Sequence, residues 1–174
     1  QTCALPISVT HGHDDHNYTK GVKGEAFVIS NPGEYEIKDV FIRGIASWHD
    51  DAQGKERGMN TIYVIEAEGM RLCHLGDIGQ AELTSEQVDQ IGNIDVLMVP
   101  VGGVYTVTGK QAAKIVNQIE PRMVIPMHYA LPKLKYKLEK SDDFLREMGA
   151  KSPETQPKLT LDRKSTRLNS SHQI

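Results

Sequence analysis

The sequence predicts an α/β protein in which β-sheets lie between helices. Its first half consists mainly of short apolar and β-branched segments, and its second half alternates apolar strands with helical patterns. An alternation of this kind is typical of βαβ units. Histidine and carboxylate side chains directly follow several of the predicted strands, which is where functional loops usually lie.

Five strands are predicted in the first half from runs of apolar and β-branched residues. They cover residues 7–10, 26–30, 40–45, 61–67 and 70–75. Asn31-Pro32-Gly33 predicts a turn between the second and the third of these strands. Glu68-Gly69 separates the last two strands and predicts a hairpin.

The second half carries clear helix signals. Thr84 and Thr108 each precede a helical pattern and have a glutamine three residues later, which is the spacing of a capping box. The first of these helices should end at Gly92, and the second at Glu120-Pro121. Buried strands are predicted at 95–101 and 123–127, and a last helix at 142–148.

The two ends of the chain differ from the rest. Residues 1–7 (QTCALPI) and 162–174 (DRKSTRLNSSHQI) resemble the translation of a sequencing-adapter oligonucleotide. We therefore expect both to be non-native tails and leave them out of the fold. Residues 8–161 suit one domain with a single core.

Composition argues against several classes of protein. No run of eighteen apolar residues is present, so no transmembrane helix is expected. The net charge of −3 and the lack of a basic stripe argue against a dedicated nucleic-acid surface. The basic cluster at 133–140 (KLKYKLEK) is interpreted as a solvated helix face, with a phosphate-steering patch as the alternative. Cys73, the sole cysteine outside the tails, cannot form an internal disulfide, which fits the reducing cytoplasm.

Four potential metal ligands lie within the hexapeptide His11-Gly12-His13-Asp14-Asp15-His16. His11 and His13 are separated by one residue, so both imidazoles can face one ion, while Asp15 and His16 can turn toward a second. Imidazole and carboxylate bind zinc, and also iron, manganese and nickel. A solvated polar loop, the alternative interpretation, explains this density of ligands poorly.

Three further candidates follow predicted strands: His49, Asp77 and His128. Each on its own would be interpreted as a loop histidine, a helix-capping aspartate or a core histidine. Together with the hexapeptide they make five histidines and two aspartates. This is the number of ligands needed for two ions that share one carboxylate.

The order H-x-H-x-D-H, a later His, Gly-Asp and a final Pro-Met-His-Tyr resembles that of the metallo-β-lactamase-fold Zn-dependent hydrolases. Within them, the small hydrolases related to ascorbate-phosphate lactonase are the most similar. The resemblance covers 8–161 and includes RGMNT at 57–61, HLGDIG at 74–79 and PVGG at 100–103. It implies the αββα sandwich of this fold. Such proteins begin with further strands, so we expect N-terminal strands to be missing here and the isolated chain to be unstable.

The resemblance also implies an assignment of ligands. One ion would be held by His11, His13 and His49, the other by Asp15, His16 and His128, with Asp77 bridging the two. True β-lactamases lack the bridging aspartate, so antibiotic hydrolysis is not expected. His13 stands where oxygen-reducing di-iron relatives carry glutamate, which argues against a redox centre.

A pair of ions at such a site has a defined chemistry. Two dications about 3.5–4 Å apart can share a water and lower its pKa to about 7, which supplies hydroxide at neutral pH. The same ions polarise a carbonyl or phosphoryl oxygen. Asp77 as the bridge, and Asp15 as a ligand that also orients the nucleophile, are therefore the expected catalytic residues. Two divalent ions, with zinc favoured over manganese, iron and nickel, are the expected cofactors.

Four residues are weaker candidates for the substrate pocket: His74, Gly103, Tyr105 and Tyr129. His74 precedes the Gly-Asp turn and would otherwise be an ordinary strand residue. Gly103 and Tyr105 lie in a strand-to-helix loop, where a plain tight turn is the alternative. Tyr129 would offer a hydroxyl group to the substrate. Asp50 is expected either to orient the His49 ring or to be a solvated loop carboxylate.

The expected function is hydrolysis of a small, anionic, ester-like substrate such as a lactone or a phosphodiester. An RNA-processing type of nuclease is the first alternative, although only 32 residues separate His16 from His49 and leave no room for a large nucleic-acid-binding insertion. A metal-binding protein without turnover is the second alternative. The oligomeric state is left open.

Overall fold

The computed structural model describes residues 6–150, 159 and 160. The expected C-terminal tail at 162–174 lies outside these residues, as do residues 1–5 of the expected N-terminal tail. Ile7, the last residue of that tail, lies in a short strand opposite Val28.

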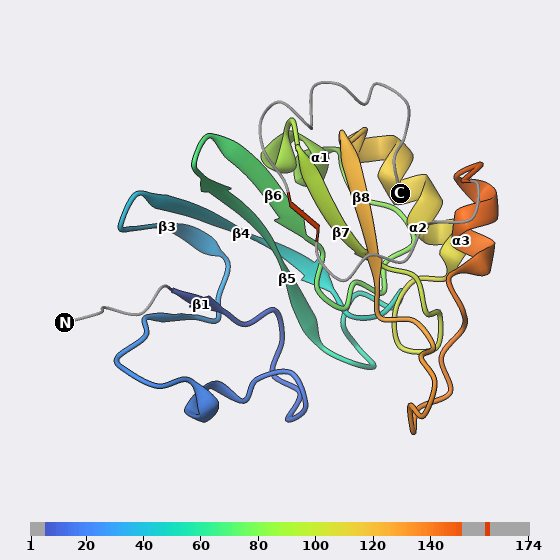
Figure 1. Cartoon of the computed structure of the whole chain (residues 1–174), viewed down its shortest axis with the longest axis horizontal. Helices are drawn as coiled ribbons and strands as arrows, with labels where there is room; N and C mark the ends of the chain where they lie inside the picture. Colours follow the sequence, from blue (N-terminus) through green and yellow to red (C-terminus); the bar gives the residue numbers. More distant parts are fainter. Residues whose placement is uncertain (1–5, 151–158, 161–174) are drawn as a thin grey trace.

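A six-stranded mixed sheet is the main element of the structure (Figure 1). Its strands are neighbours in chain order: β3 (Gly33–Ile37), β4 (Val40–Trp48), β5 (Met59–Ala67), β6 (Met70–His74), β7 (Val96–Pro100) and β8 (Met123–Met127). Strands β3 to β6 are antiparallel, and β6 to β8 are parallel. The strands predicted at 40–45, 61–67, 70–75, 95–101 and 123–127 are confirmed.

Strand β3 was not predicted, because the turn signal at 31–33 and two glutamates obscured it. Its sequence Gly-Glu-Tyr-Glu-Ile alternates in character, and Tyr35 and Ile37 pack beside Ile42. Lys38 and Asp39 both have a positive φ, at 52° and 62°, and form the two-residue turn to β4. Pairing with β4 thus stabilises a strand whose own residues indicate it only weakly.

The predicted helix signals are confirmed. Helices α1 (Ser85–Ile91) and α2 (Gly109–Ile119) begin with complete capping boxes at Thr84 and Thr108. Glu120 ends α2 in the left-handed conformation, and α3 (Asp142–Glu147) agrees with the predicted last helix. A short 3-10 turn, η1 (Thr19–Gly21), was not predicted.

The two faces of the main sheet pack against different layers (Figure 1). The larger core joins β4–β8 to the three α-helices through residues such as Ile62, Leu97 and Phe144. The opposite face of β4 and β5 packs through Tyr63 against a second, two-stranded sheet of β1 (Ile7–Ser8) and β2 (Val28–Ile29). The predicted strands at 7–10 and 26–30 are therefore present in shortened form, and the described residues supply one helical layer and two sheets.

The strand directions bring the candidate ligands to one edge. Because β4 is antiparallel to β5, and β5 to β6, strands β4, β6, β7 and β8 all end at the same edge of the sheet. The hexapeptide loop after β1 reaches this edge too, since the Thr61 amide near the start of β5 donates to the Thr10 carbonyl at 2.8 Å.

The basic cluster at 133–140 contains no helix, so its interpretation as a helix face was wrong. Lysines at 133, 135 and 137 alternate with Leu134, Tyr136 and Leu138, which is the two-residue period of an extended chain. Lys133 has φ 71°, outside the helical region. None of the helices within the described ranges is long and apolar enough to cross a membrane.

Candidate metal centre

The Asp77 carboxylate lies at the centre of the histidine cluster. Its Oδ2 atom is 3.5 Å from the His128 Nε2, 3.7 Å from the His49 Nε2 and 3.8 Å from the His11 Nε2. Asp77 and His49 are buried, and both follow strands that end at this edge. One carboxylate oxygen therefore faces three imidazole nitrogens, which is the arrangement expected of a shared ligand.

His11 is oriented by its neighbour in the chain. The hydroxyl group of Thr10 and the His11 Nδ1 form a hydrogen bond of 2.9 Å. The other ring nitrogen, Nε2, faces Asp77 and is buried without a hydrogen-bond partner among the described residues. Burial, which outweighs the attraction of Asp77, and the nearby imidazoles lower the pKa of His11 to about 4. His11 is therefore neutral at pH 7, as a metal ligand has to be.

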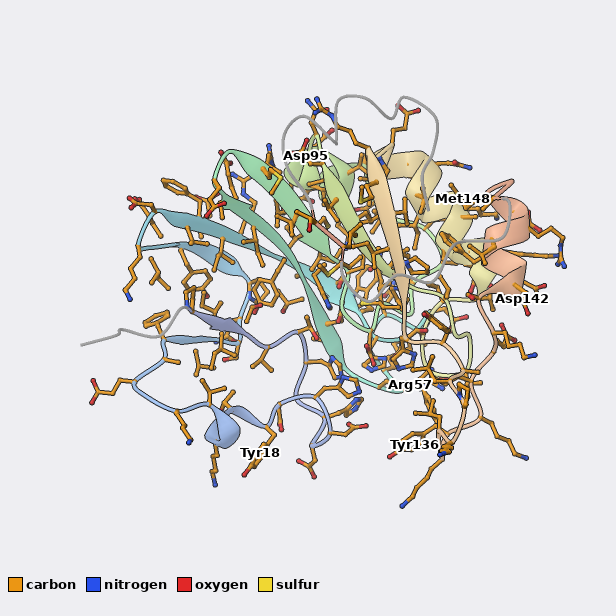
Figure 2. The ribbon with its side chains drawn as sticks, viewed as in Figure 1. Tyr18, Arg57, Asp95, Tyr136, Asp142 and Met148 are labelled. Carbon is orange, nitrogen blue, oxygen red and sulfur yellow. The ribbon has the colours of Figure 1, made fainter. Side chains whose placement is uncertain are left out.

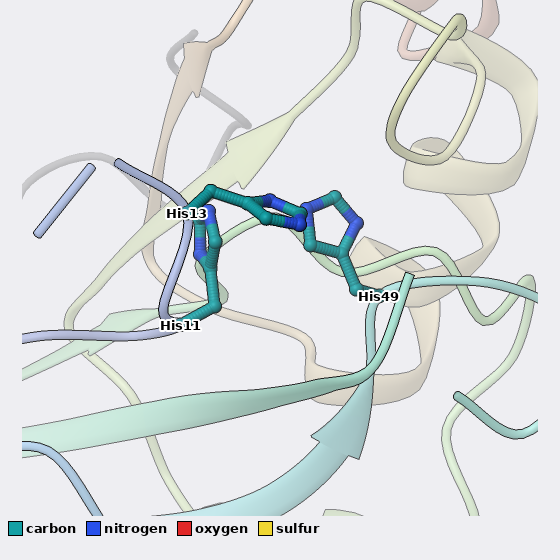
Figure 3. A group of neighbouring side chains, drawn as sticks. All are labelled: His11, His13 and His49. Carbon is teal, nitrogen blue, oxygen red and sulfur yellow. The ribbon is translucent and has the colours of Figure 1, made fainter. Parts of the chain in front are cut away.

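The first three-histidine group is formed by His11, His13 and His49 (Figure 3). One ligand atom from each residue lies within 4.8 Å of the others, and the ring centroids are 4.8 to 5.0 Å apart. Burial lowers the pKa of His49 as well. These are the residues expected to share one ion.

The second group lies nearer to solvent. His11, His16 and Asp77 also place ligand atoms within 4.8 Å of one another. The His16 Nε2 is 3.6 Å from the Asp15 Oδ2, and the rings of His16 and His128 are 6.2 Å apart. All seven predicted ligands are thus gathered in one cluster.

Buried polar contacts hold the turn that carries Asp77. The Asn60 Oδ1 accepts a hydrogen bond of 3.0 Å from the Asp77 amide. The Asn60 Nδ2 donates to the Leu75 carbonyl at 2.9 Å and to the Ser47 hydroxyl at 2.7 Å. Asn60 lies in the segment 57–61 that supported the family resemblance, but sequence reasoning gave it no role.

The Asp50 carboxylate does not accept a hydrogen bond from the His49 ring as one interpretation expected, since the ring Nδ1 has no hydrogen-bond partner among the described residues. Its two oxygens accept hydrogen bonds from four backbone amides of its own loop, those of residues 52, 54, 56 and 57, at 2.7 to 3.0 Å. Burial opposes its ionisation, but these amides outweigh burial and lower the pKa of Asp50. The alternative, a solvated carboxylate, fails as well, since Asp50 is 1% exposed. The charge of Asp50 therefore stabilises the backbone of the loop that follows it.

A cavity of about 820 Å³ opens beside the cluster. Two of the four weaker candidates, Tyr105 and Tyr129, line it together with six of the seven predicted ligands, all except His11. His74 does not, and its Nδ1 accepts a hydrogen bond from the Gly76 amide at 3.0 Å. Gly103 packs against the Glu139 carboxylate instead. Sequence reasoning missed Arg57 and four apolar residues of the loop after β8 that also line the cavity: Leu131, Leu134, Tyr136 and Leu138.

The donor set of the cluster fits divalent metal ions. It contains only imidazole and carboxylate groups, which suit zinc as well as iron, manganese and nickel. The buried Nε2 atom of His11 has no hydrogen-bond partner among the described residues, although a buried polar atom normally has one. A bound ion would satisfy it.

The fold agrees with comparisons to known proteins. Residues 6–128 match the family model of the beta-lactamase superfamily domain, and the chain therefore belongs to this superfamily. The α/β fold of the metallo-β-lactamase type, predicted by resemblance, is confirmed.

Several individual relatives are metal-dependent hydrolases by name. A UPF0173 metal-dependent hydrolase from Pyrococcus abyssi is 34% identical over 150 residues, which cover 71% of this chain and 65% of the relative. One from Thermococcus onnurineus is 33% identical over 150 residues, covering 71% and 66%. A crystal structure from Thermotoga maritima, assigned to the Zn-dependent hydrolases of the metallo-β-lactamase superfamily, is 41% identical with a TM-score of 0.69, covering 82% of this chain and 67% of that one. The chain thus spans 65 to 66% of the length of the first two relatives.

Proposed function

We propose that this protein is a metal-dependent hydrolase that binds two divalent ions, zinc by preference, and cleaves a small, anionic, ester-like substrate such as a lactone or a phosphodiester. The observation that carries the proposal is the position of the Asp77 Oδ2, which lies 3.5 to 3.8 Å from three histidine nitrogens. Membership of a superfamily that contains metal-dependent hydrolases supports it.

The proposed ligands divide into two sets. His11, His13 and His49 would hold one ion, and Asp15, His16 and His128 the other, with Asp77 shared. The tight first group supports the first set. The contact of His16 with Asp15, and the approach of His128 to Asp77, support the second.

When bound, the two ions would supply an activated water and polarise the reacting oxygen of the substrate. The residues of the chain prepare this chemistry. Asp77 keeps its carboxylate between the histidines because Asn60 holds its backbone amide. Asp15, exposed and lining the cavity, would accept a hydrogen bond from the attacking water and orient it toward the substrate. Burial keeps His11 and His49 neutral, so that their ring nitrogens remain available as ligands.

Metal content and turnover test the proposal together. We expect the wild-type chain to bind about two zinc ions, measured by elemental analysis, and to hydrolyse members of a panel of lactones, esters and phosphodiesters. Asp77→Ala should lose at least one ion and nearly all turnover. Asp14→Ala is the matched control, because Asp14 is an exposed carboxylate of the same loop outside the proposed ligand set. Unchanged turnover in Asp77→Ala would refute the shared ligand.

We further propose that the protein works in the reducing cytoplasm. Cys73 is a buried free thiol, and burial raises its pKa far above the ordinary value. Such a thiol is chemically unreactive, packs in the core and needs no oxidising compartment.

A further inference from the structure

The cavity beside the metal centre has two chemically different walls. One wall carries the candidate ligands, including His13, Asp15 and His128. The other wall is apolar and comes mainly from the loop after β8. A volume of about 820 Å³ lies in the range of sites that bind small molecules. The substrate therefore has room for a sizeable group beyond the bond that is cleaved.

The apolar wall is built from an alternating sequence. In residues 133–138, Leu134, Tyr136 and Leu138 line the cavity, while the intervening lysines do not. Leu131 and Tyr136 are both 57% exposed, although large apolar side chains gathered at one place usually mark a binding surface. The alternation thus turns apolar groups toward the cavity and leaves the lysine charges in solvent.

Aromatic side chains continue the wall toward Arg57. The rings of Tyr105 and Tyr136 meet edge to face with centroids 6.5 Å apart. The Arg57 guanidinium lies 5.9 Å from the centroid of Tyr105. Figure 2 shows Arg57 and Tyr136 on the same side of the molecule, and both line the cavity. A cation and an aromatic surface therefore border the same space.

Arg57 is the only basic residue besides histidine among those that line this cavity. In the described part of the chain its guanidinium forms no ion pair with a carboxylate. Guanidinium is well suited to bind a carboxylate or phosphate group. The backbone amide of Arg57 donates to the Asp50 carboxylate, so the loop positions Arg57 without an ion pair to its guanidinium.

We propose that the cavity selects an amphipathic monoanion, in which Arg57 binds the anionic group and the wall of Tyr105, Leu134 and Tyr136 holds an aromatic or apolar body. This inference rests on the proposed function for the reaction, and on the cavity alone for binding. The substrate class is then an anionic ester with an aromatic or apolar substituent. A purely polar sugar-like ester would leave the apolar wall in contact with water.

Binding of unreactive probes tests the inference. We would titrate 4-phenylbutyrate, 4-phenylbutyramide and butyrate into the wild-type chain, with EDTA and separately with zinc, by calorimetry and ligand-observed NMR. The wild type should bind 4-phenylbutyrate tighter than either other probe in both conditions. Arg57→Met should weaken the binding of 4-phenylbutyrate by about tenfold, the factor for a lost charge-assisted hydrogen bond. The same variant should leave the binding of 4-phenylbutyramide unchanged. Tyr136→Ala should weaken the binding of both phenyl probes and leave the binding of butyrate unchanged.

Two matched controls separate local from general effects. Lys135→Met removes a neighbouring charge that does not line the cavity, and Tyr18→Ala removes an aromatic ring that is 73% exposed elsewhere. Both should bind all probes as the wild type does. Equal affinity of the wild type for the three probes, or an Arg57→Met variant with full affinity for the anion, would overturn the inference. The metal content and turnover of Asp77→Ala report on the proposed function separately, since probe binding in EDTA needs no metal.

Discussion

The carboxylate of Asp50 accepts a hydrogen bond of 2.7 Å from the backbone amide of Arg57. Asp50 directly follows the metal-ligand candidate His49, and Arg57 borders the cavity beside the same cluster. The contact therefore connects the end of β4, which carries a candidate ligand, to a loop that carries the cation of the cavity. A single buried carboxylate sets the position of two parts of the site.

Replacement of Asp50 by asparagine should loosen this loop. An amide group cannot accept hydrogen bonds at both ends, so at least two of the four backbone amides would lose their partner. We expect Asp50→Asn to lower the melting temperature. It should also weaken the binding of 4-phenylbutyrate, which is the effect expected of Arg57→Met on binding. Calorimetry measures both. Asp51→Asn, which changes an exposed neighbour, is the control, and equal effects of the two variants would contradict the role of Asp50.

Removal of the Asn60 side chain should destabilise the turn that presents Asp77. Asn60→Ala leaves the Asp77 amide and the Leu75 carbonyl buried without partners, at a cost of about 3 kcal/mol in the free energy of unfolding. We also expect fewer zinc ions per chain. Urea denaturation and elemental analysis measure the two effects. Asn17→Ala, which removes one exposed hydrogen bond in the hexapeptide region, should change neither by a comparable amount.

A side chain at Gly76 should be poorly tolerated. Gly76 has φ 62°, and a Cβ atom there would overlap the Asn60 amide and lie 2.8 Å from the Thr10 Cβ. We expect Gly76→Ala to lower the free energy of unfolding by about 2 kcal/mol, because strain and overlap add. Gly12→Ala serves as the control, since a Cβ at Gly12 would meet nothing within 4 Å. If urea denaturation gave the two variants equal stability, the turn would be less restricted than the geometry indicates.

Alkaline pH should weaken the attachment of the small sheet through Tyr63. Burial, with a contribution from Tyr35, raises the pKa of Tyr63 to about 12. Its hydroxyl proton is shared between the carbonyls of Val9 and Ile29, at 3.1 and 3.2 Å. The unfolded chain loses this proton at about pH 10, earlier than the folded chain. The stabilisation is therefore complete below pH 10 and is lost as the pH rises toward 12.

Tyr63→Phe tests this dependence. The variant should lose about 1 kcal/mol at neutral pH, the net value of a hydrogen bond. It should also lose less stability than the wild type between pH 10 and pH 12. Tyr18→Phe, at an exposed position, should follow the wild type in urea denaturation across this range. Parallel pH profiles for Tyr63→Phe and the wild type would show that the hydroxyl group titrates as an ordinary one.

Local signals predicted most of the fold. Capping boxes at Thr84 and Thr108 depend only on residues three apart, so the starts of α1 and α2 are visible in the sequence. The hairpin at Glu68-Gly69 is local for the same reason. Strand β3 was missed because the stability of an edge strand depends on its partner strand. The lysine-rich loop was interpreted as a helix because its charges are typical of a solvated helix face, although its apolar residues recur with a period of two.

The candidate ligands were predictable for a different reason. Metal chemistry permits few side chains, and these stand at the ends of apolar strands, where the sequence alone shows them. The roles of Asn60 and Ser47 cannot be read from the sequence, since buried amide and hydroxyl groups acquire a role only from the groups with which they form hydrogen bonds. Arg57 is similar: its importance follows from the cavity it borders.

The sequence by itself therefore determined the superfamily, the three α-helices and every strand except β3, and the set of imidazole and carboxylate donors. These depend on short-range patterns and on the chemistry of single side chains. Only the tertiary structure decided that Asp77 lies among three histidines, that Asp50 binds the backbone amides of its own loop, and that an arginine and an apolar wall border the same cavity. Such relations join residues far apart in the chain, and their distances are set by sheet register and strand direction.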